Sequence, residues 1–221
     1  MSPGSSGVAK VKSEGLPPLL PFKLIKRNGL RWLNLVKYGV GIVLIYILLR
    51  LRTFKISEHT HLQSLSDPAV VWEFLADFNN MKTLNPTIID FEIISDGGPQ
   101  NDWIYTVRYS EFLHNAPSIQ NTITADFHVK KEENDVYTIA SAHTTCFFDS
   151  VYCVRAWGHF EISKSRKTTA GVDILEEVTF ECPPIFFWFC HQEALFQRQQ
   201  IKENLINYYD KLSTHQLIQG S

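Results

Sequence analysis

The sequence has little cysteine, and its cysteines follow no recognised spacing. Cys146, Cys153, Cys182 and Cys190 are too few for a dense disulfide scaffold, and no Cys-x-x-Cys pair indicates a zinc or redox site. We expect small buried thiols at these positions, because free cysteine is often found inside proteins. The sequence also contains no Asn-x-Ser/Thr acceptor, which leans toward a non-secretory compartment.

Motifs of several enzyme classes are missing as well. There is no Gly-x-Gly-x-x-Gly or P-loop for phosphate binding and no Gly-x-Ser-x-Gly elbow for a hydrolase. Short histidine and cysteine pairs occur, but none has the second half of a zinc pattern. These pairs are His59 with His61, His143 with Cys146, and Cys190 with His191. We therefore assign no catalytic residue, no metal ligand and no cofactor.

Charge is unevenly distributed along the 221 residues. The formal net charge is -2, yet residues 1–55 hold ten basic residues and one acidic residue, whereas residues 56–221 hold 11 basic and 22 acidic residues. A net-acidic larger part argues against a nucleic-acid partner. The chain thus joins a basic N-terminal segment to an acidic remainder.

The N-terminal segment contains the longest apolar run. Residues 38–49 carry no charge, and residues 33–51 form a helix of about 28 Å if the flanking basic residues extend toward the headgroups. Trp32, Tyr38 and Ile45 are candidate membrane contacts. We expect a basic disordered tail over 1–29 and a membrane helix over 30–52. An interfacial helix, a core helix and a cleaved presequence remain alternatives.

The side of the membrane on which the rest of the chain lies is left open by the sequence. Five basic residues precede the apolar run and three follow it, which favours an inside N-terminus and an outside domain. The absence of glycosylation acceptors leans the other way.

Residues 53–213 read as one folded domain, followed by a short tail over 214–221. Residues 53–63 alternate like a half-buried strand, and two short helices follow, over residues 68–78 and 79–84. Six strand-like runs, ended by turn signals, span 87–95, 103–113, 119–131, 136–146, 151–163 and 169–182. Residues 185–212 form a long helix, with one face made by Cys190, Ala194, Ile201, Leu205, Tyr208 and Leu212.

This order of elements resembles the START-like (SRPBCC) superfamily, which includes lipid-transfer START domains, birch-allergen-type proteins and the polyketide cyclase/coenzyme Q-binding branch. Residues 68–78 and 82–86, PAVVWEFLADF and KTLNP, are similar to its first-helix pattern, and residues 156–162, AWGHFEI, resemble a late strand. The resemblance implies an α+β helix-grip fold, in which a curved seven-stranded antiparallel sheet surrounds the long C-terminal helix. It also implies a cavity for a hydrophobic ligand.

Strand alternation then selects candidate ligand contacts. The inward phase of the expected strands is aromatic and apolar, which suits both a filled core and a pocket wall. Given the implied cavity, the candidate ligand-binding residues are Trp103, Tyr105, Tyr109, Phe127, Tyr152, Phe160, Glu176, Phe180, Ile201 and Leu205. Glu176 either orients a polar ligand head or is turned outward by a bulge, because an unpaired buried carboxylate is costly.

The start of the C-terminal helix is apolar around its circumference. Residues 183–190, PPIFFWFC, are either buried on all sides or presented to lipid or a partner. We expect this end to lie near a cavity mouth and to contact the membrane through Phe187 and Trp188.

Together these features predict membrane-anchored binding of a lipid or quinone-like hydrophobic molecule, with presentation or transfer as its purpose. The membrane is an expected partner, through a single N-terminal pass or an interfacial anchor, and protein partners and the organelle are not defined. One alternative is a cyclase- or hydratase-like enzyme that recruits Tyr105, Arg108, Tyr109 or Glu176 for acid/base work. The other is a membrane scaffold with a filled interior.

Overall fold

The computed structural model describes residues 22–63, 65, 67–147, 152–166 and 171–219. The first 21 residues of the expected tail, and the expected strand starts at Val151 and Thr169, lie outside the described residues. The chain divides into two units, an N-terminal helix and a folded domain, and each is described by itself.

The helix of the first unit, α1, spans Phe22–Leu49 and so begins earlier than residue 30. Its part from Arg31 to Leu49 is long and apolar enough to cross a membrane by length and composition, and none of it is buried. Trp32, Tyr38 and Ile45 are all exposed. A helix that is apolar over this length needs a lipid or protein environment to cover it.

The domain is built on one seven-stranded antiparallel sheet. Its strands are β1 (Arg52–Leu62), β2 (Ile88–Gly97), β3 (Asp102–Leu113), β4 (Ala116–Lys131), β5 (Tyr137–Phe147), β6 (Tyr152–Lys164) and β7 (Val172–Cys182). Strands β2 to β7 pair in sequence order, and β1 joins the free edge of β7, so the order is β1-β7-β6-β5-β4-β3-β2. The predicted meander is confirmed.

Two short helices follow β1, as the sequence predicts. α2 (Pro68–Ala76) begins after Asp67, whose carboxylate accepts a hydrogen bond from the Ala69 amide at 2.9 Å. Asp77 separates α2 from α3 (Phe78–Leu84) and caps the second helix through the Asn79 amide. Side-chain caps of this kind satisfy amides that have no partner inside the helix.

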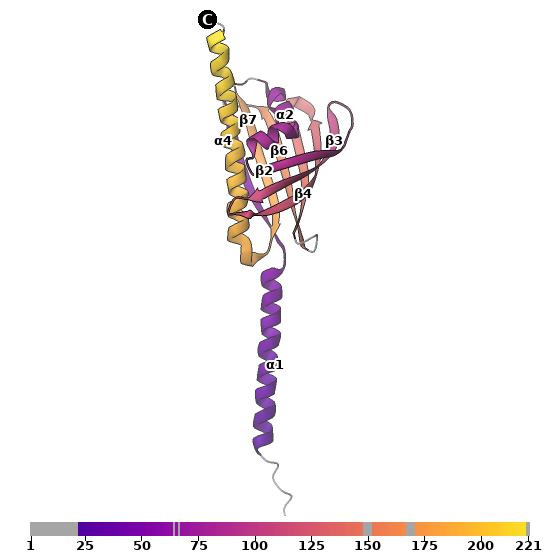
Figure 1. Cartoon of the computed structure of the whole chain (residues 1–221), viewed down its shortest axis with the longest axis vertical. Coiled ribbons are helices and arrows are strands. Elements are labelled where there is room, and N and C mark those ends of the chain that lie inside the picture. Colours follow the sequence, from indigo (N-terminus) through magenta and orange to yellow (C-terminus); the bar gives the residue numbers. More distant parts are fainter. Residues whose placement is uncertain (1–21, 64, 66, 148–151, 167–170, 220–221) are drawn as a thin grey trace, which may run out of the picture. The chain divides into compact units, whose positions relative to one another are not determined.

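The long helix α4 (Phe187–Gln219) follows a short 3-10 turn at Pro184–Phe186 and runs along the concave side of the curved sheet (Figure 1). Its buried residues include Ile201, Leu205 and Tyr209, whereas the expected Tyr208 and Leu212 are largely exposed. Steps of four residues along the helix lead from Ile201 to Leu205 and then to Tyr209, so the buried face includes Tyr209. The Tyr209 hydroxyl donates a hydrogen bond to the Val70 carbonyl at 3.3 Å. The helix-grip α+β class predicted from the sequence is confirmed.

The expectation of buried thiols is wrong, because all four cysteines form disulfides. Cys146 and Cys153 are directly opposed on β5 and β6, and Cys182 at the end of β7 is bonded to Cys190 in the first turn of α4. Strand register and the turn before α4 create these proximities, which spacing alone does not reveal. Both bridges lie at the end of the sheet where β1 begins, since Arg52 of β1 pairs with Cys182.

The interior of the domain differs between its two ends. At the end away from Arg52, the Trp72 ring packs at 5.2 Å from Trp103 and 5.1 Å from Tyr137, and Leu75 is fully buried. We call this end the closed half. At the other end, between α4 and the strand ends near Arg52, the interior is hollow. We call this end the hollow half.

Candidate functional site

The hollow half contains a cavity of about 1240 Å³, lined by α3, α4, the start of β2 and strands β3 to β7. Its walls are largely apolar, with a smaller number of polar side chains. Protein sites for small hydrophobic ligands have this composition and a comparable size. The cavity is therefore the candidate functional site.

Small inward side chains on β5 and β6 create the empty space. The inward row of β6 runs through Val154, Ala156 and Gly158 before it reaches Phe160, which is buried. A Cβ added to Gly158 would lie 2.6 Å from Ser141 Oγ on the neighbouring strand, so a larger residue here would displace the Ser141 hydroxyl. Both interior ends are thus formed by the same strands, and side-chain size decides which end is filled.

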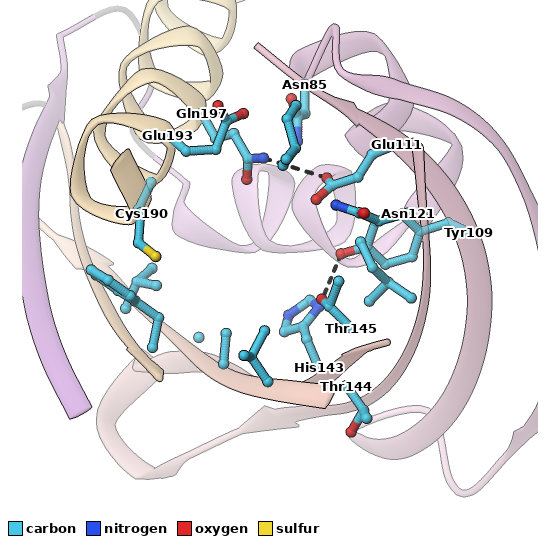
Figure 2. A pocket seen from close by; sticks show the side chains of 18 of the residues that line it. Asn85, Tyr109, Glu111, Asn121, His143, Thr144, Thr145, Cys190, Glu193 and Gln197 are labelled. Carbon is cyan, nitrogen blue, oxygen red and sulfur yellow. Dashed lines mark hydrogen bonds between the residues drawn. The ribbon is translucent and has the colours of Figure 1, made fainter. Parts of the chain in front are cut away.

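One polar group in the cavity is a chain of three side chains. The Tyr109 hydroxyl lies 3.1 Å from His143 Nδ1 (Figure 2). His143 Nε2 lies 2.9 Å from Ser141 Oγ. Burial, and then the Arg198 charge, lower the pKa of His143 to about 4, so the imidazole is neutral at pH 7. Burial also raises the pKa of Tyr109 well above its usual value, which keeps the phenol protonated.

A second polar group surrounds Glu111 on β3. Its carboxylate accepts a hydrogen bond from Gln197 Nε2 at 3.4 Å (Figure 2) and another from Thr87 Oγ1 at 3.5 Å. Burial, followed by the nearby Glu193 charge, raises the pKa of Glu111 to about 7. Asn121 lies directly opposite Glu111 on β4 and is buried. The cavity thus holds a carboxyl group that changes charge near neutral pH.

Two further charged residues that line the cavity are already paired. Glu193 on α4 accepts hydrogen bonds from the backbone amides of His114 at 2.8 Å and Asn115 at 3.2 Å, which fixes the β3–β4 turn to the helix. Arg198 forms a close ion pair with the buried Glu176 of β7. These charges hold α4 in place.

Six of the ten candidate ligand-binding residues line the cavity. They are Tyr109, Phe127, Tyr152, Phe160, Phe180 and Ile201. The other four do not line it. Three of these belong to the filled core: Trp103 packs on Trp72, Tyr105 donates to the Ala76 carbonyl at 2.9 Å, and Leu205 is buried on the inner face of α4. Alternation identifies the inward face of a strand but not the position along it where packing ends.

Glu176 faces inward, so the alternative of an outward bulge is wrong. The β1–β7 and β6–β7 registers pass through Glu176 without a shift, and its partner is Arg198 rather than the cavity. Other cavity residues, Glu111, Asn121 and Gln197, were not selected from the sequence. Continuing the Trp103–Tyr109 alternation by one more step would have placed Glu111 on the inward face.

The histidine and cysteine pairs noted in the sequence do not converge on a metal. His61 Nδ1 lies 2.7 Å from Asp173 Oδ1, and Cys146 and Cys190 are both in disulfides. Within the described ranges, no group of three or more His, Cys, Asp or Glu side chains is arranged to hold a metal ion.

Comparison with known proteins supports the fold assignment. No protein-family model and no curated protein sequence matches the chain. Solved structures match with low sequence identity. The chain has the START-like helix-grip fold. One similar structure is the Zhui aromatase/cyclase from Streptomyces, with a TM-score of 0.54 and 12% identity over 72% of this chain and 95% of that one. Human STARD10 matches with a TM-score of 0.53 and 12% identity, over 73% and 66% of the respective chains. A conserved protein from Geobacillus kaustophilus matches with a TM-score of 0.52 and 10% identity, over 72% and 96%.

Proposed function

We propose that the chain is a membrane-anchored protein that binds a lipid or another hydrophobic small molecule in the hollow half of its domain. The 1240 Å³ cavity, with largely apolar walls and two buried polar groups, is the observation that carries this proposal. Each methylene moved from water into such a cavity contributes about 0.8 kcal/mol. STARD10 and the aromatase/cyclase share the fold, which is compatible with a hydrophobic ligand.

The binding test uses residues 50–221, purified without detergent. These residues include the whole sheet and the domain core, which form a compact unit of their own. A start at residue 56 would remove the first four residues of β1, which pair with β7. We expect a fluorescent fatty-acid analogue to bind saturably at one site.

Two alanine variants make the test specific to the cavity. Ala156→Phe places a large ring in the cavity and should abolish probe binding. Ala142→Phe adds the same ring on the exposed outer face of β5 and should leave binding unchanged. Equal binding by both variants, or no binding by the wild-type domain, would contradict the proposal.

Membrane contact is the second part of the proposal. Ile185, Phe186 and Trp188 are 55%, 53% and 72% exposed, and Phe186 also lines the cavity. Because Arg52 pairs with Cys182, the start of β1 lies at the same end of the sheet as this apolar turn. In the sequence, β1 begins at Arg52, shortly after α1 ends at Leu49. An anchor ending there would keep the cavity close to its lipid supply and suits presentation or local transfer.

The residues that we propose as membrane contacts differ at one position from the expected pair Phe187 and Trp188. Phe187 is half-buried, with its ring 4.5 Å from Phe54 and 5.3 Å from His191. We therefore propose Phe186 and Trp188 as the membrane contacts.

Flotation of residues 50–221 with liposomes tests this surface. Phe186→Glu with Trp188→Glu should remove residual liposome binding. The matched control, Ile94→Glu with Ile104→Glu, changes two exposed apolar residues of β2 and β3 and should have no effect. Undiminished flotation of the first variant would contradict the assignment.

The two disulfides support an outside domain. Disulfides persist in oxidising compartments and are rare in the cytosol, and the five-to-three distribution of basic residues around the apolar run favours the same orientation. Alkylation of the unreduced chain in intact cells should label no cysteine. Labelling of all four would place the domain on the reducing side.

A second candidate function is acid/base catalysis on a hydrophobic substrate. Glu111, with a pKa of about 7, lies in the cavity with the neutral His143 and the protonated Tyr109. An enzyme would be favoured if the molecule recovered from the wild-type protein is chemically changed and the molecule recovered from Glu111→Gln is not. Recovery of the unchanged molecule favours binding alone.

A further inference from the structure

The cavity contains a buried hydrogen-bond acceptor that has no partner. Asn121 is 3% exposed, and its Oδ1 atom makes no hydrogen bond. A buried polar atom without a partner is unfavourable by about 1–3 kcal/mol. Asn121 lines the cavity (Figure 2), and because its Oδ1 atom is itself covered, a bound molecule reaches this atom once the amide turns toward the cavity.

A second acceptor lies directly beside the first. Glu111 and Asn121 are paired across β3 and β4, and both line the cavity. The hydrogen bonds from Gln197 and Thr87 to Glu111 are long, at 3.4 and 3.5 Å, so its carboxyl oxygens can accept a stronger donor. The acceptors in this corner of the cavity can therefore take a further donor.

The nearby charges disfavour an anion in the same corner. Glu193 raises the pKa of Glu111 through charge repulsion, so a third carboxylate or a phosphate would be repelled further. Arg198 already neutralises Glu176. Tyr109 and His143, which lie next along the cavity wall, are both neutral.

We propose that Glu111 and Asn121 bind the hydroxyl group of a neutral amphiphile, whose apolar body fills the rest of the cavity. The hydroxyl hydrogen is donated to Asn121 Oδ1, and the hydroxyl oxygen is available to the carboxyl group of Glu111. This inference rests on the proposed function, because it names the ligand class of the same cavity.

Four probes with one alkyl chain and different head groups test the proposal. Hexadecanol, hexadecyl methyl ether, hexadecanoic acid and hexadecylamine compete with the fluorescent probe on residues 50–221. We expect hexadecanol to bind about tenfold more tightly than the ether, as one or two neutral hydrogen bonds allow. An ether that binds as tightly as the alcohol would overturn the inference while leaving the cavity proposal intact. Failure of all four probes to compete would overturn both.

Substitution of Asn121 tests whether its side chain causes the preference for hexadecanol over the ether. Asn121→Leu keeps the side-chain volume and should reduce the preference for alcohol over ether to about onefold, with ether affinity unchanged. Asn207→Leu changes an exposed asparagine on α4 and should retain the tenfold preference. A preference that survives Asn121→Leu would contradict the assignment.

The pH dependence separates a hydroxyl from a charged head group. The hydroxyl has a single hydrogen, which it donates to Asn121 Oδ1, and its oxygen accepts from Glu111 only while that carboxyl is protonated. We therefore expect hexadecanol affinity to fall by less than about tenfold from about pH 6 to pH 8, as one neutral hydrogen bond is lost. If hexadecylamine binds best and its affinity rises tenfold over that range, the site recognises a cation. If hexadecanoic acid binds best, it recognises an anion. Either result would overturn the proposal.

Discussion

The closed and hollow halves of the domain use the same strands to opposite effect. In the closed half, Trp72, Trp103 and Tyr137 form a packed aromatic cluster over the inward face of the sheet. In the hollow half, Ser141, Ala156 and Gly158 occupy the inward face and leave space beneath α4. The fold therefore needs only one end of its interior to be packed, and the other end is available for a ligand.

The largest predicted difference concerns aromatic residues of the two halves. Trp72→Ala should lower the free energy of unfolding by about 3–5 kcal/mol, because it removes a buried ring and the Nε1 hydrogen bond to the Thr138 carbonyl. Tyr152→Ala, in the wall of the hollow half, should cost less than about 1 kcal/mol, since Tyr152 is already 37% exposed. Urea unfolding of residues 50–221 measures both. Equal losses would remove the distinction between the halves.

The second prediction concerns pH and Glu111. Its folded pKa of about 7 lies above the ordinary 4.5, so the folded state favours the protonated carboxyl. This contribution is fully present below about pH 4.5 and is lost as the pH rises through about 7, with a loss approaching about 3 kcal/mol at pH 8. Glu111→Gln should therefore gain stability relative to wild type as the pH rises.

His143 makes stability depend on pH in the opposite direction, so its contribution must be separated from that of Glu111. Its lowered pKa gives a contribution that is present above about pH 6.5 and lost as the pH falls through about 4. The difference between wild type and Glu111→Gln, measured by unfolding at each pH, cancels the His143 contribution. A difference that stays constant from about pH 5 to pH 8 would contradict a buried, titrating Glu111.

The third prediction compares one substitution at a position packed in the core with the same substitution at a position that lines the cavity. Ala125 is fully buried, so Ala125→Leu should cost about 1–3 kcal/mol through overpacking. Ala156 lines the cavity, and Ala156→Leu should change the unfolding free energy by less than about 1 kcal/mol. Thermal unfolding of both variants provides the measurement, and a large cost at both positions would indicate a filled hollow half.

The smallest predicted effect is at Asn121. Replacing a buried, unpartnered amide with an apolar side chain of similar volume should leave the ligand-free domain equally stable or stabilise it by about 1 kcal/mol. A loss above about 1 kcal/mol for Asn121→Leu in urea unfolding would mean that the amide already has a partner.

Much of the fold follows from local patterns. The alternation of residues 103–109, the Asp67-Pro68 helix start and the turn residues between strands all lie where the sequence places them. Patterns repeat within a few residues, so single-sequence reasoning detects them. The cysteine pairing was missed because it depends on which residues the register opposes, as at Cys146 and Cys153.

The site was only partly predictable for a related reason. Alternation identified Tyr109 and Phe160 as inward, yet it treated Trp103 and Tyr105 in the same way, although α2 covers them. Whether an inward side chain meets another side chain or an empty space depends on elements distant in the sequence. Glu176 illustrates this, because its partner Arg198 comes from another element.

The most direct test of the account is native mass spectrometry of residues 50–221 after incubation with mixed liposomes, followed by organic extraction. The account predicts one adduct of lipid mass per wild-type chain and none for Ala156→Phe. An unmodified mass for both proteins, or the same adduct on both, would show that the hollow half does not hold a ligand.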